Sequence, residues 1–531
     1  MKNNFEKIEE SLNKNSIKII ICLIITGIII RLYFLPFNVP ITGDGFYSFV
    51  YASKIMFDGE LPNGYTTTNT GWAYLLSAIF SITDRTDPFQ LMTIQKVSAI
   101  IISSLTVVPV YFLLKKFVSI KLALFGCLIF TLEPRLLLIS LEGLDYTLFV
   151  FIFVTAIALF LKRTNISFIV SFVCIALTSL VRYEGILLII PFSVMFLIFN
   201  KKKKDYLKLI GLISLTVLIL IPVLMIRVDV TSEICYNSIF GEICGRDGIF
   251  DNHVMRVESV SDKILGVADL DDPIYNENKP MFDHFLFLSF SGLFRFLAII
   301  CIPYFFIFIG LSFLRFRKKD FKLRTEHVFI IFVTCIALLP AIYAYGRGIQ
   351  DYRYVMVVIP LLTIFSVKIT ESIPKIEKNK IIFLILIILI IVLSIAFIEN
   401  YKPNYELREE AFYVSKKINQ LTDVVNVYQY NGYIKTAKLI EEWPELPKAV
   451  PTTGKLESST KISTAGYNTI NDFLEDEKNQ ELEYIVVDNT NEFFNDLREN
   501  PSNYDYLKLI FDSRDLDFKN EYRIYKINDE K

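Results

Sequence analysis

Long uncharged stretches dominate the first 400 residues and limit what this chain can fold into. About eleven of them are apolar enough to cross a lipid bilayer, although several fall short of the roughly 20 residues of a straight span. Hydrophobic residues make up 53% of the 531-residue chain, too many for an ordinary soluble protein. The sequence therefore predicts a polytopic α-helical membrane protein with about 11 transmembrane helices. The stretches are 17–35, 91–114, 120–132, 146–161, 166–181, 185–199, 207–226, 296–314, 328–344, 354–367 and 381–398.

Lys and Arg gather in every second connection between these stretches. Short basic connections stay in the cytoplasm, so the alternation predicts a multi-pass cell-membrane protein with a cytoplasmic amino terminus. We expect residues 1–400 to form the transmembrane domain, with outer loops at 37–90 and 227–295. The basic connections are 115–121, 162–163, 201–204, 315–324 and 375–380.

After residue 400 the composition changes to mixed polar sequence. Residues 401–531 are expected to form a soluble extracytoplasmic α/β domain, because helical and alternating patterns follow one another there. Helices are expected at 405–421, 433–442, 467–477 and 492–498, and strands at 424–430, 483–487, 507–511 and 522–527.

The first outer loop carries a lone carboxylate, Asp44, between Gly43 and Gly45. Glycines give the backbone freedom and allow a substrate to approach closely, which suits a catalytic base. Residues 46–57 and 71–80 have the spacing of two short helices at the membrane surface. The alternative is that Asp44 only caps a helix in a solvated loop. Spacing alone leaves both interpretations open.

Cysteine and histidine content bears on redox state and on metals. Cys235 and Cys244 bracket YNSIFGEI in the outer loop 227–295, where an oxidising exterior would permit a disulfide; two free thiols are the alternative. Three histidines and no CxxC motif give little support for a metal site, and no cofactor is indicated, although a divalent cation stays open. The formal net charge of −1 gives no indication of nucleic-acid binding.

Five segments stand out in the first 370 residues: GDGFYSFVYASKI, GWAYLLSAIF, TLEPRLLLISLEGLDY, SLVRYEGILLIIPF and DYRYVMVVIPLLTI. Together they resemble the GT-C superfamily of membrane glycosyltransferases, specifically its protein O-mannosyltransferase-like branch (family 39 and its Rgt-like relatives). The resemblance covers roughly the first 370 residues and implies a GT-C-like fold. Many members have Glu after the loop Asp. Gly45 stands there instead, which puts a metal role at that site in doubt, and the WWDYG motif of the oligosaccharyltransferase branch is absent.

This resemblance implies a hexosyl- or pentosyltransferase of the cell envelope that uses a polyprenyl-phosphate sugar as donor and a protein, lipid or glycan as acceptor. The family's proposed base corresponds to Asp44, which would take the acceptor proton in an inverting transfer. The departing phosphate needs a cation, preferably an arginine at an outer helix end. The candidates for this phosphate site are Arg182, Arg353, Arg295, Arg347, Tyr183 and Tyr352. A second acidic site would involve Glu133, Glu142 and Asp145, unless these are solvated loop charges.

Two other classes of membrane protein share the hydrophobicity. A flippase or transporter of polyprenyl-linked sugars should show ionisable residues at helix midpoints or paired broken helices, and the sequence offers only Pro109 and Pro303 as kink candidates. A noncatalytic anchor for the C-terminal domain would not need eleven spans or a Gly-Asp-Gly loop. The sequence therefore favours an enzyme surrounded by membrane lipids.

Overall fold

The computed structural model describes most of the chain and divides it into two compact units. One unit contains residues 1–35, 66–72 and 96–402, and the other contains residues 36–65, 73–95 and 403–531. The described residues are 2–59, 70–83, 86–200, 203–231, 278–313, 324–346, 351–373, 379–421, 427–428, 431–441, 443, 467, 469–475, 482–488 and 492–528.

Each of the eleven apolar stretches forms a helix or a pair of helices in the first unit. Six helices are long and apolar enough to cross a membrane, and two bent pairs raise this number to eight. Three shorter apolar helices, at 146–160, 165–181 and 183–199, match the remaining stretches. Among the described residues, the elements are α1 (Lys2–Tyr33), α4 (Pro88–Leu105), α5 (Val107–Leu114), α6 (Ile120–Thr131), α7 (Pro134–Leu141), α8 (Tyr146–Phe160), α9 (Asn165–Val181), η1 (Tyr183–Leu188), α10 (Ile189–Phe199), α11 (Lys203–Thr231), α14 (Asn278–Cys301), α15 (Phe305–Phe313), α16 (Thr325–Ala337), α17 (Leu339–Gly346), η3 (Tyr352–Val358), α18 (Ile359–Ser372) and α20 (Lys380–Tyr401).

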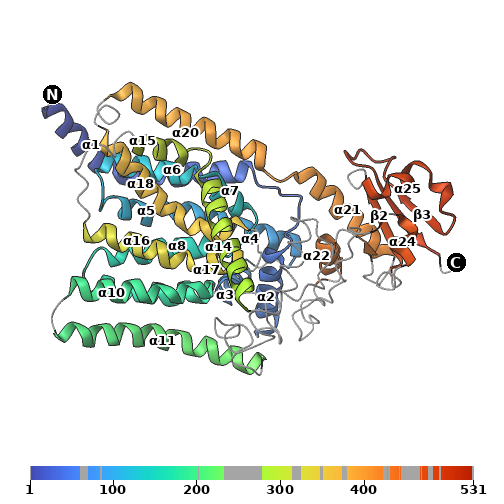
Figure 1. Ribbon diagram of the computed structural model, residues 1–531, viewed down its shortest axis with the longest axis horizontal. Helices are drawn as coiled ribbons and strands as arrows, with labels where there is room; N and C mark the ends of the chain where they lie inside the picture. The colour runs from blue at the N-terminus through green and yellow to red at the C-terminus, as the bar shows by residue number, and fades with distance from the viewer. Residues whose placement is uncertain are drawn as a thin grey trace. The chain divides into compact units, whose positions relative to one another are not determined.

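Aromatic packing joins several of these helices, and α10 runs alongside α11 and α16 (Figure 1). Phe160 of α8 packs against three other helices, with ring centroids 5.2 Å from Phe168, 4.7 Å from Phe192 and 4.8 Å from Phe329. Such clusters bury large apolar areas and stabilise a close-packed helical core.

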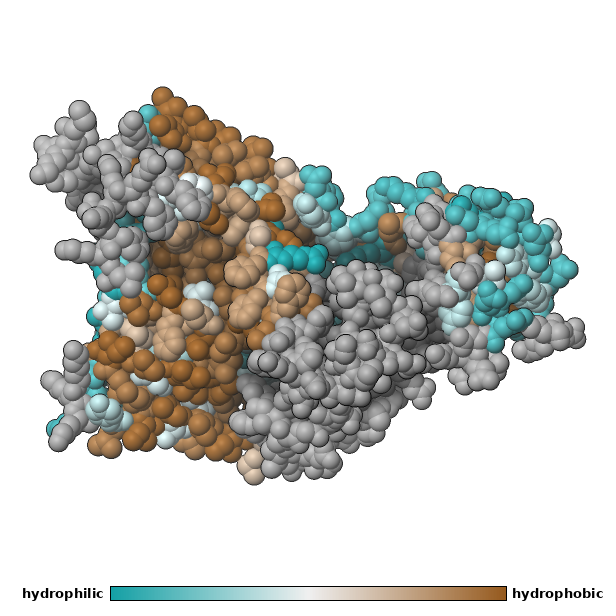
Figure 2. Space-filling view, in the orientation of Figure 1, coloured by the Kyte–Doolittle hydropathy of each residue, from teal (hydrophilic) through white to brown (hydrophobic). Residues whose placement is uncertain are grey.

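The outer surface of this unit is also apolar. Ile17, Ile21, Ile25 and Ile29 form one exposed stripe along α1, and hydrophobic residues cover much of the helical face seen in Figure 2. Contiguous exposed apolar surface is unstable against water but stable against lipid chains. This pattern supports the expected polytopic membrane protein.

Two of the membrane helices are broken, one of them at the kink candidate Pro303 and the other at a position that the sequence did not indicate. Helices α6 and α7 meet at 47°, and α14 and α15 meet at 101°, next to Pro303. Arg135, at the first break, donates a hydrogen bond to the Ile300 carbonyl at 3.3 Å and others to the Ile299 and Ile302 carbonyls. One buried guanidinium thus satisfies the carbonyls that the second break frees.

The second unit combines most of the first outer loop with the C-terminal domain. The loop contains α2 (Asp44–Asp58) and α3 (Thr70–Ile82), as its two helical patterns predict. The C-terminal sheet has the order β1-β2-β4-β3, with β1 parallel to β2 and the other pairs antiparallel. Its elements are α21 (Tyr405–Leu421), β1 (Val427–Tyr428), α22 (Asn431–Glu441), α24 (Ile470–Glu475), β2 (Tyr484–Asp488), η5 (Glu492–Phe494), α25 (Asn495–Glu499), η6 (Pro501–Asn503), β3 (Leu507–Asp512) and β4 (Tyr522–Ile527).

Both faces of this sheet are covered, because β2 and β4 alternate inward side chains between two clusters. Ile485, Val487 and Tyr525 face a cluster with Phe473, whereas Val486 and Ile524 pack with α21. The expected α/β organisation of this region is confirmed. The predicted strand 424–430 is described only at 427–428, and the predicted helix 492–498 consists of η5 and the short α25.

Candidate active site

Arg182 lies in a sharp turn between α9 and η1, in the VRYEG segment. Its backbone is extended, with φ −143° and ψ 126°, and its N–H donates to the Thr178 carbonyl at 2.8 Å. Gly185 packs directly on the end of α9: an added Cβ would lie 2.6 Å from the Ser179 nitrogen. Only glycine fits this close approach, so Gly185 allows η1 to pack against the end of α9.

The Arg182 guanidinium is held by two carboxylates. Its Nη2 lies 2.8 Å from Glu184 Oε1, and its Nη1 lies 3.6 Å from Asp145 Oδ2. The rings of Tyr146 and Tyr354 lie 5.8 and 5.9 Å from its Cζ, within cation–π distance. One cation therefore faces two anions, so this group is net negative when all three residues are ionised.

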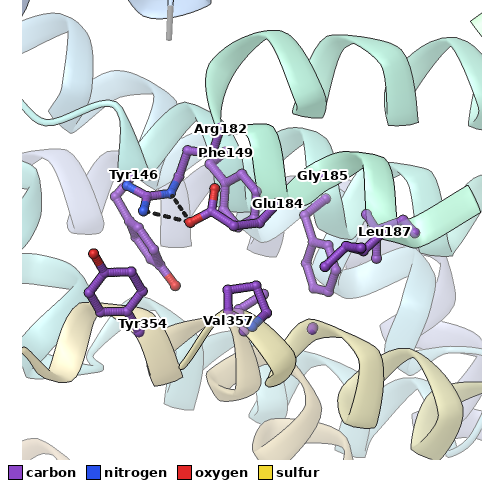
Figure 3. A pocket seen from close by; sticks show the side chains of 12 residues that line it. Tyr146, Phe149, Arg182, Glu184, Gly185, Leu187, Tyr354 and Val357 are labelled. Carbon is purple, nitrogen blue, oxygen red and sulfur yellow. Dashed lines mark hydrogen bonds and ion pairs between the residues drawn. The ribbon is translucent and has the colours of Figure 1, made fainter. Parts of the chain in front are cut away.

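A pocket opens in front of this ion pair (Figure 3). It has one polar end, at Arg182 and Glu184, with Tyr354 on the facing wall. Its cavity volume is about 20 Å³, and the space of about 420 Å³ around it includes open solvent. The other lining residues are almost all apolar: Phe149, Phe153, Gly185, Leu187, Leu188, Ala337, Pro340 and Val357. This lining combines apolar walls with a polar end, the two kinds of contact that a ligand with a hydrocarbon part and a polar head makes.

Two buried polar atoms at this polar end have no hydrogen-bond partner among the described residues. They are the Tyr146 hydroxyl and Glu184 Oε2. Buried polar groups are normally satisfied, and unsatisfied ones in a pocket indicate where a ligand or water binds.

Arg353 forms a second local ion pair, with Asp351. Asp351 caps η3 by accepting the Arg353 N–H at 2.8 Å, and its other oxygen lies 2.5 Å from Arg353 Nε. Tyr345 donates to the Asp351 carbonyl at 2.9 Å and fixes this turn against α17. The turn belongs to the same unit as Arg182, and Tyr354 follows Arg353 directly, so η3 brings the DYRY segment to the pocket wall.

Glu133 has a structural setting that differs from that of a solvated loop charge. It is fully buried, caps α7 by accepting the Leu136 N–H at 2.7 Å, and lies 3.3 Å from Arg135 Nη1. Of the three predicted acidic residues, only Asp145 contacts Arg182 in the described structure; Glu142 lies half-buried at the end of α7. The grouping of these three residues as one acidic site stays a prediction.

Asp44 is the first residue of α2, after Gly43 as the N-cap residue. Its side chain is exposed, and Gly43 has φ 62° and ψ −139°. This backbone conformation is open essentially only to glycine. Gln95 donates from its side-chain amide to the Gly45 carbonyl at 2.9 Å and fixes the residue after Asp44.

The other predicted residues fall into two groups. Arg295 is exposed on α14, Tyr183 is 45% exposed, and Tyr352 is half-buried at the start of η3. Arg347, Cys235 and Cys244 lie outside the described residues. Within the described part of the chain, no three His, Cys, Asp or Glu side chains are grouped so that they could hold a metal ion.

Sequence reasoning selected Asp145 but missed the other residues around Arg182. Glu184, Tyr146 and Tyr354 complete the polar end of the pocket, and none was selected from the sequence. Glu184 could have been found, because a carboxylate two residues after an arginine in a turn with glycine commonly pairs with it.

The solved structures that resemble this chain include the following three. The first is the Archaeoglobus fulgidus oligosaccharyltransferase tethered with an acceptor peptide containing the NVT sequon: identity is 13%, coverage is 88% of this chain and 69% of that chain, and the TM-score is 0.50. For the same enzyme with an inhibitory peptide and a dolichol-phosphate, identity is 13%, coverage is 88% of this chain and 69% of that chain, and the TM-score is 0.49. For ArnT from Cupriavidus metallidurans bound to undecaprenyl phosphate, identity is 12%, coverage is 82% of this chain and 74% of that chain, and the TM-score is 0.44. No family model and no curated protein matches the sequence.

The likeness to the first structure concerns the fold. This chain has a GT-C-like fold. The expected architecture, a polytopic helical membrane part followed by a C-terminal α/β domain, is therefore confirmed, whereas the protein O-mannosyltransferase-like branch stays a hypothesis.

Proposed function

We propose that this protein is a membrane glycosyltransferase that takes a sugar from a polyprenyl-phosphate-linked donor. The observation that carries this proposal is a largely apolar pocket that ends at Arg182, between α8, η1, α17 and η3. An isoprenoid chain fits apolar walls, and a phosphate fits a guanidinium at their polar end. The resemblance to the oligosaccharyltransferase fold supports the same enzyme class.

Arg182 stabilises the leaving group in this proposal. As the bond between sugar and phosphate breaks, negative charge grows on the phosphate, and a fixed cation stabilises that charge more than it stabilises the ground state. Glu184 holds the same guanidinium face at 2.8 Å, so the phosphate exchanges with Glu184 when the donor binds. Arg353, paired with Asp351 in the same unit, is the second candidate.

Asp44 is the proposed general base. It would accept the proton of the acceptor hydroxyl while the sugar is transferred with inversion. Its exposure at the start of α2 leaves its carboxylate accessible to an acceptor, and its glycine neighbours allow close approach. We assign the acceptor to the extracytoplasmic face, as a protein, lipid or glycan, in line with a protein O-mannosyltransferase-like branch.

The test compares variants of the two arginines that flank α9. Arg182→Ala removes the proposed phosphate ligand. Arg163→Ala is the matched control, because Arg163 precedes the same helix and pairs with Glu326 at 2.7 Å. Each full-length protein is purified in detergent and titrated with undecaprenyl phosphate as the probe.

Arg182→Ala should bind undecaprenyl phosphate at least tenfold more weakly, because a charge-assisted contact is lost. Arg182→Lys should bind with intermediate affinity, since the charge stays but the planar fork is lost. Arg163→Ala should bind like wild type. Equal binding by all four proteins would place the phosphate elsewhere.

A lipid-sugar transporter is the competing class, and the two broken helices bear on it. In transporters, carbonyls freed at such breaks hold substrate ions. Here Arg135 binds the Ile299, Ile300 and Ile302 carbonyls at one break, and Glu133 caps the helix at the other. Both breaks are satisfied internally, which favours the enzyme.

A further inference from the structure

The C-terminal domain contacts the turn that precedes Asp44. Thr436 on α22 is fully buried, and its hydroxyl donates to the Ile41 carbonyl at 3.2 Å. Ile41 is itself buried and lies three residues before Asp44. Both residues belong to the same compact unit, so this bond joins segments 395 residues apart in the sequence.

A second contact from the same region holds helix α2. Trp443 stacks on Phe49, with ring centroids 5.7 Å apart, and meets Phe57 edge-on at 5.4 Å. Its indole N–H donates to the Thr86 carbonyl. Phe49 is completely buried, so Trp443 packs against the inner face of the helix that Asp44 begins.

Asp44 itself is exposed, and the glycines on either side provide little restraint. Two hydrogen bonds hold the backbone on either side of Asp44: Thr436 donates to the Ile41 carbonyl and Gln95 donates to the Gly45 carbonyl. Loss of the Thr436 hydroxyl would leave a buried carbonyl unsatisfied, and the turn would then sample other conformations. A shift of about 1 Å in a catalytic group can reduce turnover about a hundredfold.

We propose that the C-terminal domain is a positioning element for the catalytic turn, with Thr436 and Trp443 as the residues that hold it. The catalytic part rests on the proposed function, in which Asp44 is the base. The structural part, that α22 restrains the turn, rests on the two contacts alone.

The test uses four variants of the full-length protein. Thr436→Val keeps the shape but removes the donor, and Thr436→Ser restores a hydroxyl. Trp443→Ala removes the second contact. Ser415→Ala is the matched control, because Ser415 is also fully buried in the C-terminal domain but donates within its own helix, to the Ala411 carbonyl at 2.7 Å.

The rate of amide hydrogen exchange measures directly how often the turn at Asp44 opens. The N–H groups of Phe46 and Tyr47 donate to the Gly43 carbonyl at 3.1 and 3.3 Å, so they exchange when the first turn of α2 opens. Thr436→Val and Trp443→Ala should exchange there about five- to tenfold faster than wild type. Thr436→Ser and Ser415→Ala should exchange like wild type.

Sugar transfer is then measured in membranes with a panel of synthetic polyprenyl-phosphate sugars. Thr436→Val should lower kcat about tenfold while KM for the donor stays constant, and Thr436→Ser should recover kcat. Unchanged exchange in both Thr436→Val and Trp443→Ala overturns the proposal, whatever Asp44 does. Faster exchange with unchanged kcat overturns its catalytic part. Faster exchange together with a fully active Asp44→Asn protein supports the restraint and refutes only the base assignment.

Discussion

The pairing of Glu184 with Arg182 leads to an unusual expectation: removal of a carboxylate should tighten ligand binding. Both side chains are largely buried, with 9% of Glu184 and 22% of Arg182 exposed, and they meet at 2.8 Å. A donor phosphate needs the guanidinium face that Glu184 occupies. Glu184→Gln keeps the size and a hydrogen bond but removes the competing charge, so the phosphate should bind more tightly.

The size of the effect follows from the charge that is removed. Two unit charges about 4 Å apart interact by about 4 kcal/mol near a protein surface. Measured exposed pairs contribute only about 0.2–1 kcal/mol, because solvation offsets most of the attraction. For this partly buried pair we expect about 1–2 kcal/mol, which corresponds to roughly five- to thirtyfold tighter binding.

Titration of purified full-length protein with undecaprenyl phosphate checks this value. Glu326→Gln is the matched control, because it neutralises the partner of Arg163 beyond the other end of α9 and should leave binding unchanged. If Glu184→Gln binds the lipid as wild type does, or more weakly, the phosphate does not exchange with Glu184 and the reasoning is refuted.

Four further predictions concern other parts of the chain. Asp44→Asn should reduce transfer about a hundredfold or more while undecaprenyl phosphate binding stays constant; near-normal turnover would exclude Asp44 as the base. Gly43→Ala should lower turnover by backbone strain alone, since φ is +62° and an added Cβ meets nothing within 4 Å; wild-type kinetics would show that the turn relaxes freely. If the C-terminal domain is outside, an impermeant thiol reagent should label Ser502→Cys in intact cells but not Lys162→Cys, in a background without Cys235 and Cys244; the reverse pattern would invert the proposed topology. Burial acts against ionisation of Asp512, but hydrogen bonds and positive charge from Arg514 and the charge of Arg523 outweigh it and lower the Asp512 pKa. The stability that this gives should be present above the ordinary aspartate pKa of about 3.9 and lost as the pH falls through the lowered value, so acid unfolding of wild type and Asp512→Asn should differ in that range.

The secondary structure could be predicted well because the signals for it are local. Long apolar stretches form helices in which every backbone group is bonded, and this depends only on the residues of the stretch itself. The predicted strands 483–487 and 522–527 are rich in β-branched and aromatic residues and are found at 484–488 and 522–527, and the predicted helix 405–421 matches α21 in full. Helix breaks were harder to predict. Pro303 marks one bend. At the break between α6 and α7, Glu133 caps α7 and Arg135 donates to carbonyls at the end of α14 and just after it, which are distant in sequence.

The sequence alone determined which segments are apolar helices, where the apolar stretches give way to mixed polar sequence, and which arginine and aspartate stand at helix ends. Only the tertiary structure decided which other residues those side chains contact. Asp145 reaches Arg182 from another helix, and Thr436 reaches Ile41 across 395 residues. Helix and strand periodicity arises from neighbouring residues, whereas a pocket or an anchored turn arises when distant segments pack and bury each other's polar groups.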